Sequence, residues 1–540
     1  MFELKDSSEQ RLTDAKPVVA NYKLTEWPWV YIAIAIITLV HLATLTDDHD
    51  WGGDFSHYIH HAKNLAEGKH YLDTGYIIAP PALFMGPYGY PPIFPLILAP
   101  VYSFFGLDLI ALKAANVLFF CLLLIQLSKL CLLQFNQLQT LSVIVLAGFN
   151  PYLADSTNSI LPDFTFTFFV YLSLWLMIRL FDCQQQSLKA SALVISLLGI
   201  TMYLGYGTRE VGLVLPLTVL TYEIVCKRRI SLISVISIAV FCFLAMVQHQ
   251  LLQDNFTPAH IVHNMKALAP EKIRNLGTSN FSFIKFDIAQ IFQQTLAYLR
   301  SIKYFYFPST TDSLKIVTGV TLGIIAILAV IGFATQLIKK ITVLEIFSAG
   351  YIVTLLLYSG FIGDRYLVPV FPLFLYYMMI GYRQLNSLLT QRWKLISIIS
   401  ALTLTSVSYA HGNLNYPEQA RIFGPFHPAA TEMFDFIRNH ANQQDTVVFE
   451  KPRVMALLTQ RTSISYPRYR LRTPEMMDAY LTAAAADYYV HVNMGAERLP
   501  HVIPADSAPP SPNLHEVFRN DYFVVYHYPK TPNLNQPRGG

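Results

Sequence analysis

Long apolar stretches recur along the chain and are separated by short polar turns or by longer polar segments. A helix needs ~20 predominantly apolar residues to cross a bilayer. Stretches of roughly this length cover residues 28–46, 109–132, 138–153, 163–181, 190–207, 210–226, 231–250, 315–337, 342–361, 366–382 and 394–411. The pattern predicts a polytopic α-helical membrane protein with about 11 transmembrane helices, which form one transmembrane domain over residues 28–411.

Lysine and arginine are distributed unevenly between the two sets of loops, and loops rich in these residues tend to stay in the cytoplasm. The basic set contains Lys5, Arg11, Lys16, Lys23, Lys189, Lys227, Arg228, Arg229, Lys339, Lys340, Arg383, Arg392 and Lys394. We therefore expect residues 1–27 to form a cytoplasmic tail. An odd number of spans then places loops 47–108 and 251–314, and everything after residue 411, outside the cytoplasm.

The composition narrows the class of protein further. Of the 540 residues, 53% are hydrophobic and only 14% are charged, which excludes an ordinary soluble protein. The net charge of +4 comes from scattered basic residues, so we expect no nucleic-acid partner. The five cysteines have neither metal-type nor disulfide spacing. Together with the basic cytoplasmic loops, this favours a bacterial inner membrane over the alternative, an endoplasmic-reticulum membrane.

After residue 411 the pattern alternates between helical and strand periods, which predicts a small extracytoplasmic α/β domain over residues 412–530. No glycine-rich phosphate loop opens any of its helices, so a nucleotide site is not expected there. Its expected role is to cap the membrane domain. Residues 531–540, which are rich in proline, asparagine and glycine, are predicted to be a disordered tail.

The segment DFSHYIHHAKNLAEG directly follows the first apolar stretch and carries candidate chemistry. Its apolar residues recur at helical spacing and predict an amphipathic helix on the membrane surface; they are Phe55, Tyr58, Ile59, Ala62, Leu65 and Ala66. Asp54 precedes this stripe, so it is either a helix N-cap or a carboxylate placed to accept a proton. His57 and His61 could bind a divalent metal together with Asp54. The alternative interpretation, which is commoner for histidines on such a helix, is that both imidazoles are exposed to solvent.

These residues resemble a known family. Asp54, Tyr58, Ala62 and Gly68 reproduce the D-x-x-x-Y-x-x-x-A-x-x-x-x-x-G pattern in the first extracytoplasmic loop of GT-C glycosyltransferases. Further family-like segments follow in the expected order at residues 88–108, 150–169, 205–217 and 363–373. The resemblance covers roughly residues 28–383 and is greatest to the protein-mannosyltransferase and aminoarabinose-transferase branch (glycosyltransferase family 39-like). The first loop departs from several relatives by having a single acid in place of a D-E or D-D pair.

The resemblance implies an enzyme that transfers a sugar from a polyprenyl-phosphate-linked donor, with inversion, to an extracytoplasmic lipid, glycan or protein. Such a donor arrives in the bilayer, so no nucleotide fold is needed. No cofactor is required, although a divalent metal at His57 and His61 with Asp54 stays open. Tyr58 and Tyr90 are the expected substrate-binding residues.

Charged residues at the ends of the spans support this function. The predicted topology places Asp54, Asp163, Arg209 and Arg365 on one membrane face, where they can share a cavity, because charges inside hydrocarbon are costly. Asp54 would be the general base and Asp163 would orient a substrate or tune Asp54. Arg209 and Arg365 would bind the donor phosphate through their planar guanidinium groups.

The sequence also allows other roles for these residues and other functions for the protein. Asp163 would also serve as a helix N-cap, and Tyr58 as a packing residue. The two arginines would also serve as interfacial anchors, with Arg365 paired to Asp364. A glycan polymerase or ligase would share the topology, whereas a lipid flippase or transporter would need repeats and ionisable groups near the bilayer midplane. Such groups are nearly absent from the predicted spans.

Overall fold

The computed structural model describes residues 28–77, 89–182, 188–252, 288–306, 315–357, 363–387, 390, 409, 423–465, 473–492 and 511–529. The predicted tails 1–27 and 531–540 lie outside these residues. So do most of the loop 251–314 and nearly all of the predicted span 394–411.

Ten of the eleven predicted spans coincide with helices. Their bounds are α1 (Pro28–Ala43), α4 (Leu109–Cys131), α5 (Gln137–Gly148), α7 (Asp163–Asp182), α8 (Leu188–Tyr206), α9 (Val214–Tyr222), α10 (Leu232–Leu251), α14 (Lys315–Lys339), α15 (Val343–Leu357) and α16 (Phe371–Asn386). Within the described residues, three helices, α4, α7 and α10, are both long and apolar enough to cross a membrane. The number of spans therefore stays a prediction.

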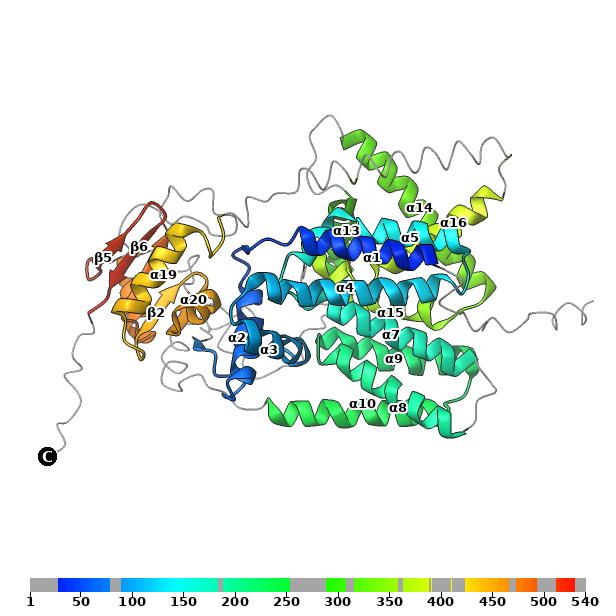
Figure 1. The fold of residues 1–540 in the computed structure, drawn as a ribbon, viewed down its shortest axis with the longest axis horizontal. Coiled ribbons are helices and arrows are strands. Elements are labelled where there is room, and N and C mark those ends of the chain that lie inside the picture. The colour runs from blue at the N-terminus through cyan, green and yellow to red at the C-terminus, as the bar shows by residue number, and fades with distance from the viewer. Residues whose placement is uncertain are drawn as a thin grey trace, which may run out of the picture.

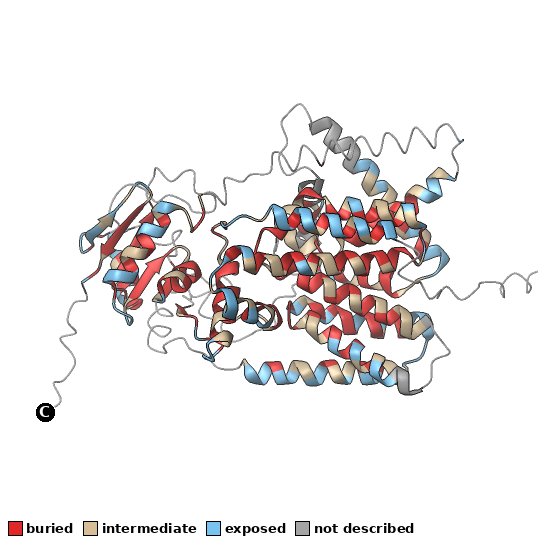
Figure 2. Cartoon of the chain, in the orientation of Figure 1, coloured by how far each residue is buried: buried red, intermediate tan, exposed pale blue. Residues whose placement is uncertain are grey.

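The helices form a bundle in which α4 packs against α1 and α7, and α8 packs against α7 and α10 (Figure 1). Buried side chains such as Phe120, Leu124 and Val170 form its core. The bundle is also apolar outside, because large hydrophobic side chains on α10 such as Phe243 and Met246 are more than 60% exposed (Figure 2). A helix that is apolar toward both core and surroundings is typical of a lipid-facing position.

Five strands near the C-terminus and one short strand from the first loop, β1, form a six-stranded sheet with the strand order β1-β3-β2-β4-β6-β5. The strands are β1 (Tyr76–Ile77), β2 (Thr446–Phe449), β3 (Thr462–Ser465), β4 (Tyr488–Val492), β5 (His515–Arg519) and β6 (Phe523–His527). Strands β1 to β4 pair in parallel, whereas β6 pairs antiparallel with β4 and β5. The associated helices are α19 (Pro428–His440), α20 (Pro452–Thr459) and α21 (Pro474–Ala483). The helical and strand segments follow the predicted alternation; that they form an extracytoplasmic domain stays a prediction.

The first predicted loop contributes to both parts of the molecule. Its helices α2 (Gly53–Ala66) and α3 (Ile93–Phe105) lie between the bundle and the sheet (Figure 1). Strand β1 from the same loop pairs with β3, with Tyr76 opposite Ser463 and Ile77 opposite Ile464. The loop therefore connects the helical bundle to the C-terminal sheet.

The prediction that α2 has a solvent-exposed polar face is wrong, whereas its position at the membrane surface stays a prediction. Helix α2 packs against α3 on one side and α20 on another. His57 and His61, expected to be solvent-exposed, are 1% and 0% exposed, and the neighbouring His60 is 6% exposed. The apolar stripe showed one buried face, but it carried no sign that Tyr71, Tyr76 and Tyr90 of the same loop would pack on the histidines, or that α20 would pack on the helix.

Candidate active site

Asp54 lies in the first turn of α2, and its carboxylate meets donors from three distant segments. Oδ1 accepts a hydrogen bond from Tyr90 Oη at 2.5 Å and another from Arg453 Nη1 at 3.1 Å. Oδ2 accepts one from Arg365 Nη2 at 2.5 Å. The N-cap position belongs to Gly52, which makes no side-chain capping bond. The N-cap interpretation of Asp54 is therefore wrong. Its carboxylate instead binds two arginines and a tyrosine.

Arg453 is the site residue that sequence reasoning missed. It lies at the start of α20 and is only 4% exposed. Its guanidinium donates to Tyr90 Oη at 2.8 Å and lies over the rings of Tyr76 and Tyr90, 5.0 and 5.1 Å from their centroids. Cation–π contacts of this kind hold a desolvated guanidinium in a fixed plane. The C-terminal sheet region thus supplies part of the site.

A second ion pair lies beside the first. Arg209 Nη2 is 2.7 Å from Asp163 Oδ1, and the two side chains are 7% and 5% exposed. The contact lacks hydrogen-bond alignment, and both Nη groups of Arg209 have no hydrogen-bond partner among the described residues. A buried guanidinium with unused donors is a feature that calls for an explanation, such as a ligand.

The Tyr366 ring connects the two ion pairs. It belongs to the short 3-10 helix η8 (Asp364–Leu367), which also carries Arg365. The guanidinium carbons of Arg209 and Arg365 lie 4.5 and 5.8 Å from the centroid of this ring. The structure therefore brings together the four charged residues singled out from the sequence. Arg365 pairs with Asp54 and not, among the interactions described, with its neighbour Asp364.

The two predicted substrate-binding tyrosines have different surroundings. The ring of Tyr58 is stacked on that of Tyr90 with centroids 4.5 Å apart, and it packs edge-on against Phe94. Tyr58 is 3% exposed, and burial raises the pKa of its phenol. Its position suits packing, which was the alternative interpretation. Tyr90 instead uses its hydroxyl to bind Asp54.

The electrostatics of Asp54 follow from these contacts. Burial alone would raise the pKa of the carboxyl, because it disfavours the charged form. Arg365 and Arg453, together with the hydrogen bond from Tyr90, outweigh this effect, and the pKa of Asp54 is lowered. In this state the carboxylate is ionised but weakly basic.

The proposed metal ligands are already engaged. His61 Nδ1 donates to the Tyr71 carbonyl at 2.8 Å, and its Nε2 faces the Tyr90 backbone N–H at 3.4 Å. Burial lowers the pKa of His61 to about 3, so the ring is neutral. Within the part of the chain that the structure describes, no group of three or more metal-ligating side chains is assembled. His57, His61 and Asp54 thus do not form a site there, and metal use stays an open prediction.

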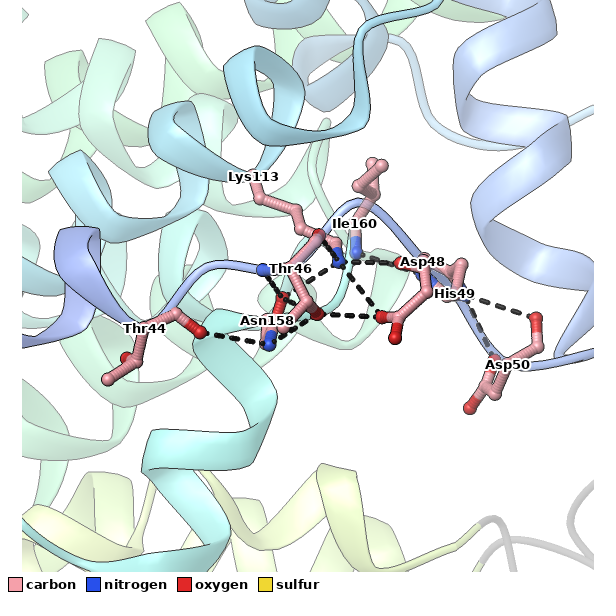
Figure 3. A network of polar contacts seen from close by, with 8 residues as sticks. All are labelled: Thr44, Thr46, Asp48, His49, Asp50, Lys113, Asn158 and Ile160. Carbon is pink, nitrogen blue, oxygen red and sulfur yellow. Dashed lines mark hydrogen bonds and ion pairs between the residues drawn. The ribbon is translucent and has the colours of Figure 1, made fainter. Parts of the chain in front are cut away.

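Lys113 fixes the chain that leads into α2. It projects from α4, is 0% exposed, and its Nζ donates to the Thr46 and Asp48 carbonyls, each at 2.6 Å, and to Asn158 Oδ1 at 2.7 Å (Figure 3). In the same network His49 Nε2 accepts from the Ile160 backbone N–H at 3.2 Å. The segment before Asp54 is thereby attached to the segment before Asp163.

Three solved structures share the arrangement of the chain. ArnT from Cupriavidus metallidurans, bound to undecaprenyl phosphate, is 12% identical, with 96% of this chain and 100% of that chain covered and a TM-score of 0.54. The Archaeoglobus fulgidus oligosaccharyltransferase complex with Zn and sulfate is 12% identical, with 86% and 68% covered and a TM-score of 0.59. The arabinofuranosyltransferase AftD from Mycobacteria is 10% identical, with 93% and 40% covered and a TM-score of 0.54.

The predicted GT-C fold is confirmed. No family model matches the chain, and no curated protein matches it in sequence. At identities of 10 to 12% the similarity is one of fold. The chemistry must therefore be argued from the residues of this chain.

Proposed function

We propose that the protein is an integral membrane glycosyltransferase that transfers a sugar from a polyprenyl-phosphate-linked donor to an extracytoplasmic acceptor. The observation that carries the proposal is the position of Asp54. Its carboxylate, in a GT-C fold, pairs with two guanidinium groups, Arg365 from η8 and Arg453 from α20. Two neighbours fit a lipid-linked donor, because ArnT is bound to undecaprenyl phosphate and the archaeal oligosaccharyltransferase AglB was solved with an inhibitory peptide and a dolichol-phosphate.

In the proposed reaction Asp54 is the general base. The acceptor hydroxyl attacks the anomeric carbon and gives its proton to Asp54 as the new C–O bond forms. The bond between the anomeric carbon and the phosphate oxygen breaks on the opposite face, and the polyprenyl phosphate leaves with the electron pair. Attack opposite to the leaving group inverts the anomeric centre, and a positioned base contributes typically ~10²- to 10⁴-fold to such a step.

Arg365 and Arg209 are the proposed phosphate ligands. Arg365 has 28% of its side chain exposed, so it is open to a ligand. Arg209 is buried, but both of its Nη groups lack a hydrogen-bond partner in the described part of the chain. With Arg453, the site has three guanidinium groups and two carboxylates, Asp54 and Asp163, a surplus of one positive charge. A sugar phosphodiester, which carries one negative charge, would balance it.

The cellular setting belongs to the same proposal. We place the N-terminus in the cytoplasm, and the site with the C-terminal domain on the periplasmic side of a bacterial inner membrane. This orientation rests on the basic loops, which favour the cytoplasm. It brings the lipid donor to Asp54 from the bilayer and an acceptor from the aqueous side.

A transfer assay with Asp54→Asn tests the proposal. Membranes that contain the wild-type protein should move radiolabel from a polyprenyl-phosphate sugar to an acceptor, and membranes with Asp54→Asn should not. Asp435→Asn is the matched control, because Asp435 makes an exposed ion pair with Arg438 on α19. Full activity of a normally folded Asp54→Asn variant would remove the proposed base.

A further inference from the structure

The two oxygens of Asp54 have separate partners, and these partners differ in burial. Oδ1 is held by Tyr90 and Arg453, and Arg453 is only 4% exposed. Oδ2 is held by Arg365, which is 28% exposed. Oδ1 therefore has one buried partner, Arg453, and one partly buried partner, Tyr90, whereas Oδ2 has a partner that a ligand can reach.

We propose that Asp54 and the donor phosphate compete for Arg365, so that donor binding releases Oδ2 as the base while Arg453 and Tyr90 keep the carboxylate in place. This inference rests on the proposed function and concerns the control of the same site. Arg453 is here a positioning residue, because it acts through Asp54.

Charge and geometry support the exchange. A guanidinium presents its donors in one planar fork, which suits a carboxylate or a phosphate equally well. Arg365 lies near Tyr366, the ring that it shares with Arg209, so it can turn to a phosphate without leaving the site. Loss of one of two cationic partners makes a carboxylate more basic, which agrees with the lowered pKa of Asp54 while both arginines are bound.

The exchange gives the reaction an order. Before the donor binds, Oδ2 is hydrogen-bonded to Arg365 and weakly basic. It therefore cannot accept the proton of an acceptor hydroxyl. Once the phosphate takes Arg365, Oδ2 is free to accept the proton, and Oδ1 stays fixed by two hydrogen bonds. The same arginine that stabilises the leaving group thus controls the base.

Competition predicts an unusual phenotype for the inactive variant. Asp54→Asn removes the competitor for Arg365 and should bind undecaprenyl phosphate more tightly than wild type, by about fivefold. Arg365→Gln should weaken binding by at least about tenfold, whereas Arg453→Gln should leave the Kd within about threefold. Binding is measured on the full chain in nanodiscs by competition with a fluorescent analogue of undecaprenyl phosphate.

Asp435→Asn makes the same charge change at an exposed pair and should keep the wild-type Kd. If Asp54→Asn binds no more tightly than this control, the exchange is overturned. If the wild type itself does not bind the lipid phosphate, the proposed function fails first, and the inference fails with it.

A second variant covers the case in which Asp54→Asn does not fold. The single substitution leaves Arg453 buried beside a neutral amide, which is destabilising. Combining Asp54→Asn with Arg453→Met removes that charge while Arg365 remains free. The double variant should also bind undecaprenyl phosphate about fivefold more tightly than wild type, and a wild-type or weaker affinity would overturn the exchange.

Discussion

Arg209 and Asp163 form an ion pair with an Nη2 to Oδ1 distance of 2.7 Å, although both side chains are more than nine-tenths buried. Arg209 precedes a short 3-10 helix after α8, and Asp163 begins α7, so the pair joins two elements of the bundle. A buried charge pair of this kind contributes little net stability when intact, but it is costly to break from one side.

We therefore expect Asp163→Asn to destabilise the protein by about 3 to 5 kcal/mol, because Arg209 would be left as an uncompensated buried charge. Thermal unfolding in detergent should show a clearly lowered midpoint. Asp435→Asn, which breaks an exposed pair, should cost about 1 kcal/mol or less. Equal midpoints for the two variants would contradict a structural contribution of the Arg209–Asp163 pair.

Arg365→Gln should raise the apparent KM for the donor by at least about tenfold, because a charge-assisted contact to phosphate is lost. The KM for the acceptor should change much less. Steady-state transfer rates at varied donor and acceptor concentrations check this expectation. Arg438→Gln is the control, since Arg438 is an exposed arginine of α19 away from Asp54; an unchanged donor KM for Arg365→Gln would exclude the phosphate contact.

The lowered pKa of Asp54 predicts a pH dependence of stability. Its folded-state pKa lies below the ordinary value of 3.8, so the ionised carboxylate stabilises the folded state above that pH. This contribution is lost as the pH falls through the folded-state value. The difference in unfolding midpoint between wild type and Asp54→Asn should therefore shrink as the pH is lowered from 7 toward 3. A constant difference over this range would contradict the ion pairs at Asp54.

Lys113→Met should destabilise the segment before α2. The three oxygens that now accept from Nζ would lose their charged donor, at a cost on the order of 3 kcal/mol. The displaced segment leads into α2, which carries Asp54, so kcat should fall while the Kd for undecaprenyl phosphate changes little. Lys129→Met, near the other end of α4, is the control. A wild-type kcat in Lys113→Met would show that the network does not position the base.

Much of the helical framework was predictable, because an apolar stretch of sufficient length is a strong local signal. The same holds for Asp54, whose spacing to Tyr58 and Gly68 carried the family resemblance. The grouping of Asp54 with Asp163, Arg209 and Arg365 followed from the predicted topology. It places all four at span ends on one membrane face, because charges inside hydrocarbon are costly.

The role of Arg453 could not be predicted from the sequence, and the reason is physical. It contacts Asp54 across 399 positions of the chain, and nothing in its local sequence sets it apart from other arginines near a helix start. Strand β1 was missed because two residues show no periodicity. Both features arise when the C-terminal sheet packs on the first loop, whereas the contacts of His57 and His61 come largely from Tyr71, Tyr76 and Tyr90 of that loop itself.

The pairing of β1 with β3 also bears on protein engineering. Because Tyr76 and Ile77 extend a sheet whose other strands begin at Thr446, the C-terminal sheet region is not a self-contained module. A chimera that borrows this region from a relative without its first loop would leave an unpaired strand edge, which invites aggregation. Recombination designs should therefore move both pieces as a single unit.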